Sequence, residues 1–143
     1  MPAKINFFSE EIDFKLKSKK NLRSWIEQTV ATESCILKEI NFIFCDDQYL
    51  LKINQDYLQH DTYTDIITFD NSETAKEIVS DIFISVERVA ENALTYQIST
   101  LQELYRVMIH GTLHLLGYKD KSPKEKKTMT DKENFYLTHL VFI

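Results

Sequence analysis

The sequence predicts an α+β fold in which a small, mixed and partly parallel sheet of about four strands packs with about five helices. Short runs rich in β-branched and aromatic residues alternate with segments whose apolar residues recur at helical spacing. The expected order β-α-β-α-β-β-α-α-α contains two crossovers, which favour parallel pairing, and then two adjacent strands. The 143 residues show no repeat or linker, so we expect a single domain, 1–143.

The first half of the chain is expected to alternate strands with helices. Residues 5–8 form a short apolar run typical of a strand. Residues 21–30 have apolar side chains on one helical face, and residues 40–44 alternate as in a strand with a buried face. Asp46 is a good N-cap for a helix that reaches residue 57.

The second half is expected to begin with two strands and to end with three helices. Residues 64–69 and 78–86 are rich in β-branched residues. Ser85 can cap the helix that follows. The run Thr100–Glu103 has the pattern of a capping box, which predicts the start of the next helix. A last helix is expected from about residue 125 to residue 140.

Charge and composition limit the class of protein. The formal net charge is −5, so binding to nucleic acid requires a local basic patch. Cys35 and Cys45 lack metal-type spacing and are interpreted as small buried hydrophobes in a reducing compartment. We find no apolar run of signal-peptide or membrane-spanning length, and therefore expect a cytoplasmic protein that does not bind membranes.

A pair of histidines in a helical segment predicts a metal site. His110 and His114 lie one turn apart, about 40° from each other on one helical face. Gly117 stands where a left-handed cap would end the helix, and Asp120 follows as a third ligand. This spacing matches the zinc signature of metzincin proteases, but Gly111 replaces the glutamate that they need as general base. The pattern therefore favours a catalytic metal and disfavours peptide hydrolysis.

The residues around this motif resemble those of a known family. The run His110–Tyr118 (HGTLHLLGY) resembles the signature of the YbeY family, the bacterial rRNA maturation factors that act as metal-dependent endoribonucleases. The similarity covers most of the chain from about residue 40. Further residues similar to that family are Ile53, Asn54, Tyr57, Asp61, Thr64–Phe69, Asp81, Ile82, Met129 and Glu133.

The resemblance implies a function and a set of partners. It implies a single-strand-specific, metal-dependent endoribonuclease that acts in rRNA processing (16S rRNA maturation) and ribosome quality control. The implied partners are ribosomal RNA and the small ribosomal subunit, together with ribosomal proteins and a ribosome-assembly GTPase. It also implies one zinc ion per chain, with other transition metals as alternatives, held by His110, His114 and Asp120.

Two of the departures from the family pattern bear on the chemistry of the site. Asp120 stands where the family usually has a third histidine; a carboxylate is an acceptable ligand and makes the site one charge less positive. Leu58 stands where the family usually has an arginine, so if that arginine contacts phosphate, this chain either uses another cation or binds RNA less tightly.

RNA carries its own nucleophile, the 2′-OH, so cleavage needs a Lewis acid, positioning and proton transfer. The candidates for proton transfer are His60, Asp61 and Asp65. A run of lysines directly follows the histidine motif, and Arg106 precedes it by one turn. The candidates for contacts with RNA are Arg106, Lys119, Lys121 and Lys124.

Two other functions remain open at this point. One is a metzincin-like metalloprotease, which Gly111 disfavours. The other is a non-catalytic ribosome assembly factor in which the metal is a structural clip. If the metal were structural, His114→Ala would destabilise the domain, whereas in a nuclease it would remove cleavage and leave the fold intact.

Overall fold

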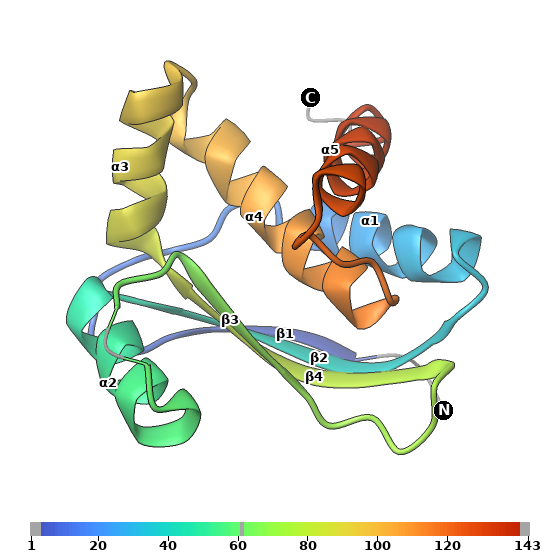
Figure 1. Cartoon of the computed structure of the whole chain (residues 1–143), viewed down its shortest axis with the longest axis horizontal. Coiled ribbons are helices and arrows are strands. Elements are labelled where there is room, and N and C mark those ends of the chain that lie inside the picture. The colour runs from blue at the N-terminus through green and yellow to red at the C-terminus, as the bar shows by residue number, and fades with distance from the viewer. Residues whose placement is uncertain (1–3, 61, 141–143) are drawn as a thin grey trace.

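The computed structural model describes residues 4–60 and 62–140 and contains, in these residues, the predicted order of elements. Figure 1 shows a sheet with helices on both of its faces. The α+β class and the partly parallel sheet are confirmed. The elements are β1 (Lys4–Ser9), α1 (Lys19–Thr32), β2 (Ile36–Cys45), α2 (Asp47–Leu58), β3 (Ile66–Asp70), β4 (Glu77–Ser85), α3 (Val86–Tyr96), α4 (Thr100–Leu115) and α5 (Pro123–Leu137).

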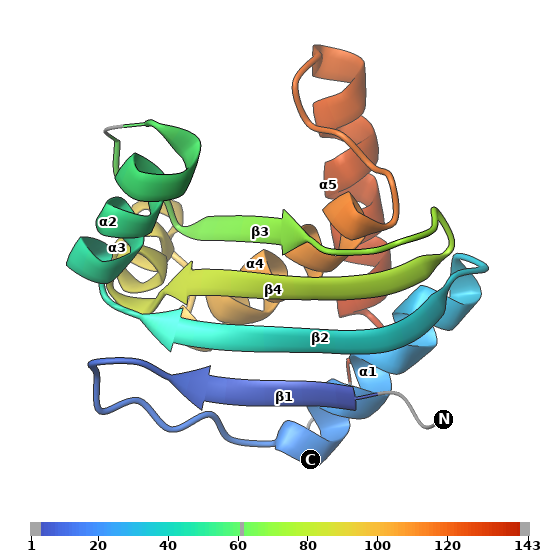
Figure 2. The same ribbon diagram turned by 90° about the horizontal axis from the view of Figure 1, so that it is seen from below.

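The four strands have the spatial order β1-β2-β4-β3, which Figure 2 shows from below. β1 and β4 each pair with β2 in parallel, and β3 pairs with β4 antiparallel. The crossover through α1 accounts for the parallel pair of β1 and β2, and the short connection between β3 and β4 accounts for the antiparallel pair. The second predicted crossover is wrong in its detail, because α2 leads from β2 to β3, which runs antiparallel to β2, and the parallel partner of β2 is β4. β3 is therefore an edge strand, next to the helix that carries the two histidines.

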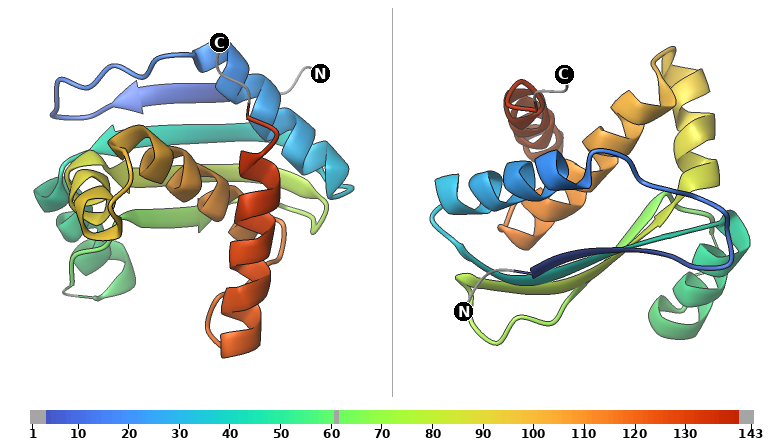
Figure 3. Two further views of the ribbon diagram at one scale, coloured as in Figure 1. Left: turned by 90° about the horizontal axis from the view of Figure 1, so that it is seen from above. Right: turned by 180° about the vertical axis from the view of Figure 1, so that it is seen from behind.

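The main core lies between the sheet and the helices α1, α4 and α5, which cover one face (Figure 3). Alternate residues of β2, such as Phe42 and Phe44, point into it. Trp25 of α1 is buried there, and its Nε1–H donates to the Tyr136 carbonyl at 2.7 Å. On the opposite face, Leu50 of α2 packs against a smaller cluster.

Several element boundaries differ from the predicted ones. The N-cap of α4 is Ser99, whose hydroxyl accepts from the Gln102 N–H, so the predicted capping box is wrong by one residue. The carboxyl of Glu103 is buried inside the protein and cannot fold back onto the helix start. α5 begins earlier than predicted because Ser122 forms a capping box with Glu125 and Pro123 occupies the first helical turn. The predicted caps Asp46 and Ser85 are confirmed.

Gly111 lets α4 lie close to β3. A Cβ atom at this position would lie 2.7 Å from Ile66 Cδ1 and 3.5 Å from Thr68 Oγ1. A methyl group would displace only the flexible end of Ile66, whereas a longer side chain would have to enter the contact between helix and strand. None of the described helices is long and apolar enough to cross a membrane.

Candidate metal centre

The last two turns of α4 place two imidazole rings side by side. The Nε2 atoms of His110 and His114 are 3.0 Å apart, and the ring planes are nearly perpendicular. Both side chains are partly exposed, His110 at 23% and His114 at 31%. The spacing of one helical turn puts both rings on the same face, as the sequence predicts.

Gly117 reverses the chain directly after these rings. It has φ +105°, in the left-handed region that favours glycine. Its N–H donates to the His114 carbonyl and the Tyr118 N–H donates to the Leu113 carbonyl, both at 3.1 Å, which completes a Schellman motif. The predicted left-handed cap is confirmed, and it turns the following loop back toward the histidines.

This loop brings Asp120 to the two rings. Asp120 Oδ2 lies 3.3 Å from His110 Nε2 and 3.4 Å from His114 Nε2. Ligands that are 2.0–2.2 Å from one tetrahedral ion lie roughly 3.3–3.6 Å apart. The three donor atoms therefore have nearly the separations of one face of a tetrahedral site. Within residues 4–60 and 62–140, this is the one such group of His, Cys, Asp or Glu residues found.

Two imidazoles and a carboxylate fit a zinc ion or another transition dication. All three side chains are partly exposed, so water and a substrate can reach a metal held between them. The donor set is that of a catalytic site with three protein ligands, and differs from the four closed ligands of a structural zinc site.

The other nitrogen of His110 contacts a buried carboxylate. Nδ1 lies 2.6 Å from Oε2 of Glu133, a residue of α5 whose side chain is 8% exposed. Glu133 Oε1 accepts from Arg106 Nη1 at 2.8 Å. Burial of the His110 ring opposes its protonation, but the hydrogen bond and charge of Glu133, with the charges of Asp120 and Asp65, raise its pKa above the ordinary value.

The role of Glu133 is not predicted from the sequence, where this residue appears only as a family similarity. The sequence does, however, contain a pattern that indicates a buried role for Glu133. Glu133 follows Met129 by one helical turn and precedes Tyr136 by another, so a carboxylate lies on the buried face of α5. A buried carboxylate on such a face requires a cationic or hydrogen-bonding partner.

A second anchor holds the loop that carries Asp120. The Tyr118 hydroxyl donates to Glu33 Oε1 at 2.6 Å, and Glu33 lies just beyond the end of α1. Glu33 Oε2 accepts from the Tyr136 hydroxyl and from Lys132 Nζ. Partial burial alone would raise the pKa of Glu33, but these hydrogen bonds and the Lys132 charge lower it overall.

The structure describes two of the three residues proposed for proton transfer, His60 and Asp65. Asp65 is half-buried at the start of β3, and burial raises the pKa of its carboxyl although the nearby His110 charge lowers it. His60 is exposed; its backbone N–H donates to the Asn54 carbonyl, and no described contact joins its ring to the three ligands. Asp61 lies outside the described residues.

A further buried acid lies in the same region. Glu103 is 3% exposed, and its Oε1 has no hydrogen-bond partner among the described atoms. Burial and the nearby charge of Asp65 raise the pKa of Glu103. The interior beside His110 is therefore rich in carboxyl groups, with Arg106 as a nearby cation.

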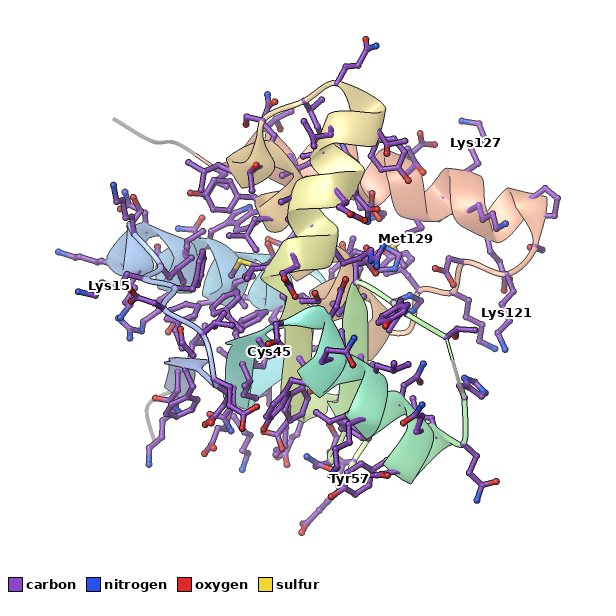
Figure 4. The ribbon with its side chains drawn as sticks, turned by 90° about the vertical axis from the view of Figure 1, so that its left-hand side faces the viewer. Lys15, Cys45, Tyr57, Lys121, Lys127 and Met129 are labelled. Carbon is purple, nitrogen blue, oxygen red and sulfur yellow. The ribbon has the colours of Figure 1, made fainter. Side chains whose placement is uncertain are left out.

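The predicted RNA-binding cations fall into two groups. Lys119, Lys121 and Lys124 are exposed in the loop after α4 and in the first turn of α5. Figure 4 shows Lys121 pointing outward at the edge of the molecule. Arg106 is different, because its guanidinium bonds to Glu133 and Asn134 of α5. The structure thus assigns Arg106 a contact that the sequence does not predict.

Comparisons with known proteins show which family the chain resembles. A family model described as Endoribonuclease YbeY matches residues 4–141. A protein from Amoebophilus asiaticus, named Endoribonuclease YbeY, is 52% identical over 135 residues, which cover 94% of this chain and 92% of that protein. A protein of the same name from Cytophaga hutchinsonii is 48% identical over 134 residues and 94% of each chain.

A solved structure has a similar fold. The solution structure of TM1509 from Thermotoga maritima matches with a TM-score of 0.66 and 28% sequence identity. The match covers 95% of this chain and 88% of that chain.

Proposed function

The chain belongs to the YbeY family of endoribonucleases, and from this premise we propose that His110, His114 and Asp120 bind one zinc ion at which single-stranded ribosomal RNA is cleaved. Membership makes the protein a metal-dependent endoribonuclease with a role in rRNA processing. The observation that carries the site assignment is the convergence of three ligand atoms at separations of 3.0–3.4 Å.

We assign metal binding and proton transfer to different residues of the site. A bound divalent ion supplies Lewis acidity toward the phosphoryl group and lowers the pKa of a coordinated water. His110, His114 and Asp120 fix its place. Asp65 is our candidate for proton transfer, because it lies near His110 and its raised pKa suits a group that gives and takes a proton. His60 and Asp61 stay predictions.

Zinc is proposed for the metal because the ligand separations are close to those of a tetrahedral ion and two of the three donors are imidazoles. The carboxylate of Asp120 makes manganese or iron(II) stronger competitors than they would be at a site of three histidines.

The exposed lysines support the proposal for the substrate. Lys119, Lys121 and Lys124 form a local cationic segment next to the ligands in a chain of net charge −5. Such a segment binds phosphates without reading sequence. It is our candidate for the cation that replaces the missing arginine at Leu58, which lies at the end of α2.

Family membership supports the biological setting that we propose. The substrate is small-subunit rRNA (16S rRNA maturation, with a role in ribosome quality control), bound in the small ribosomal subunit. Ribosomal proteins and an assembly GTPase are proposed as neighbours, the cytoplasm as the location, and residues 1–143 as one nuclease domain.

A comparison of two histidine variants tests this function. His114→Ala should lose both zinc and cleavage of single-stranded rRNA, while circular dichroism shows an unchanged fold. His139→Ala is the control, since His139 is exposed after the end of α5 and should keep both properties. A folded, zinc-free His114→Ala protein that cleaves RNA at the wild-type rate would overturn the proposal and would point to a contaminating nuclease.

The two alternative functions give different results. A metalloprotease is disfavoured because the position of its general base is Gly111, which packs against β3. If the protein is a non-catalytic factor with a structural metal, a chelator should lower its melting temperature. The purified protein should then show no RNA cleavage with or without the chelator.

A further inference from the structure

We propose that Glu133 is a positioning residue for the metal centre, and that Arg106 holds Glu133 in that role. Glu133 fixes the ring of His110 with a proton on Nδ1, so that the lone pair of Nε2 is free for the metal. This inference rests on the metal site proposed above and adds two residues to it that do not touch the metal.

The geometry requires a defined tautomer. His110 uses Nε2 toward His114 and Asp120, and Nδ1 toward Glu133 Oε2 at 2.6 Å. An ionised carboxylate only accepts hydrogen bonds, so Nδ1 must carry the hydrogen. In a neutral ring, Nε2 is then the nitrogen with a lone pair. A carboxylate behind a metal-binding imidazole also orients the ring and makes it a stronger ligand.

Burial makes this contact more rigid than a surface hydrogen bond. The Glu133 side chain is 8% exposed and lies on the face of α5 that carries Met129 and Tyr136. A buried carboxylate without a partner is strongly destabilising, so Glu133 cannot easily leave its partners. Its two oxygens go to different partners, Oε1 to Arg106 and Oε2 to His110.

Arg106 completes the arrangement from the same helix as the ligands. It precedes His110 by one turn of α4. Its Nη1 donates to Glu133 Oε1 at 2.8 Å and its Nη2 donates to Asn134 Oδ1 at 2.9 Å. The guanidinium thus donates hydrogen bonds to two consecutive residues of α5. The guanidinium occupies Oε1 of Glu133, so Oε2 is left to accept from His110.

The two histidines are therefore not equivalent. No partner for His114 Nδ1 is found among the described residues, whereas His110 Nδ1 has a buried carboxylate. His110 is fixed before the metal arrives, while His114 and Asp120, which are more exposed, can adjust to it. Loss of Glu133 should weaken metal binding because the ring of His110 is then free to rotate and to change tautomer.

Zinc affinity of the full chain tests the proposal without any RNA. Glu133→Gln keeps the shape of the side chain and one acceptor oxygen but removes the charge. Glu133→Met removes the charge and both acceptor oxygens. Loss of a residue of this kind weakens metal binding about 10- to 100-fold. We expect Zn²⁺ affinity, measured by competition with a chelator, to fall in the order wild type, Gln, Met. Arg106→Gln should also weaken it.

A variant of the same helix provides the control. Asp131→Asn removes a carboxylate of α5 that is exposed and paired with Lys127, and it should leave zinc affinity unchanged. Nitrogen NMR of the histidine rings provides a readout that general destabilisation does not move. At a pH high enough for the ring to be neutral, the metal-free wild type should show the proton of His110 on Nδ1, and the Met variant should show a mixture of tautomers.

The outcomes separate this inference from the metal site itself. If the wild type binds no zinc, the proposed site fails. If the wild type binds zinc and both folded Glu133 variants bind it within twofold of the wild type, the positioning role is overturned while the site stands. Weaker binding with an unchanged tautomer in every variant would also overturn it.

Discussion

Tyr118 and Glu33 are 85 positions apart in the chain, and the Tyr118 hydroxyl donates a 2.6 Å hydrogen bond to the Glu33 carboxylate. Tyr118 follows Gly117 and precedes Asp120 by two residues. The bond therefore attaches the ligand-bearing loop to the end of α1. The start of the short loop is thus held twice, by the Schellman motif and by this anchor.

Removal of the Tyr118 hydroxyl should loosen the loop. Tyr118→Phe deletes one hydrogen bond to a charged group, and we expect the free energy of unfolding of the zinc-free protein to fall by about 1–3 kcal/mol. Zinc affinity should fall as well, because Asp120 is then less well placed. Urea unfolding and a zinc competition titration measure the two effects. Tyr57→Phe, at an exposed tyrosine of α2, is the control; an equal loss in both variants would contradict the anchor.

Glu33 should give the protein a measurable acid dependence. The pKa of Glu33 is lower in the folded protein than its ordinary value of 4.5, so its contribution to stability is fully present above pH 4.5 and is lost as the pH falls through the lowered value. Glu33→Gln should therefore be less stable than the wild type at pH 7, and this difference should shrink below pH 4.5. Urea unfolding of zinc-free protein from pH 7 to pH 3 measures it. A difference that stays constant over this range would show that the charge of Glu33 is not involved.

Gly111 should tolerate a methyl group but not a glutamate. The nearest atom to an added Cβ is the flexible end of Ile66, and alanine favours the helix by about 1 kcal/mol, so Gly111→Ala should change stability by less than about 1 kcal/mol. Gly111→Glu forces a charged side chain into the contact with β3 and should cost more than about 3 kcal/mol. Thermal and urea unfolding compare the two. A stable Gly111→Glu protein would contradict the close packing of α4 on β3.

The lysines after α4 should control the salt dependence of RNA binding. Each phosphate contact on single-stranded RNA contributes about 0.7 to the slope of log affinity against log salt concentration. Replacing Lys119, Lys121 and Lys124 together with glutamine should lower this slope by up to about 2. The matched control replaces three other exposed lysines, Lys15, Lys19 and Lys20, with glutamine. This replacement changes the net charge by the same amount. Lys15 lies on the opposite side of the molecule from Lys121 in Figure 4. An equal loss of slope in both proteins would show that total charge decides binding.

Much of the fold follows from local patterns in the sequence. Helical and alternating apolar periodicities give the order of the elements, and Gly117 gives the reversal after α4, because these features depend on near neighbours. The strand order β1-β2-β4-β3 does not follow, since it depends on contacts between distant segments. The cap of α4 was misplaced by one residue because Ser99–Gln102 and Thr100–Glu103 both fit the pattern.

In the candidate site, too, local features could be predicted from the sequence and contacts between distant residues could not. His110, His114 and Asp120 lie within one short stretch, so their spacing alone predicts that they converge. Glu133 and Arg106 could not be assigned in this way. Their contact joins residues 27 positions apart, and it depends on the angle at which α5 packs on α4, which no local pattern contains. The same reasoning explains why Arg106 was expected to face RNA, although the structure pairs it with a carboxylate.

The tight contact of Gly111 with β3 has a consequence for the evolutionary history of this kind of centre. Metzincin peptidases share the spacing of the three metal ligands found here. The glutamate that they carry after the first histidine would stand at Gly111, where α4 touches β3. If Gly111→Glu unfolds the protein as expected above, that one substitution could not convert this centre to peptide hydrolysis, however closely the metal ligands agree.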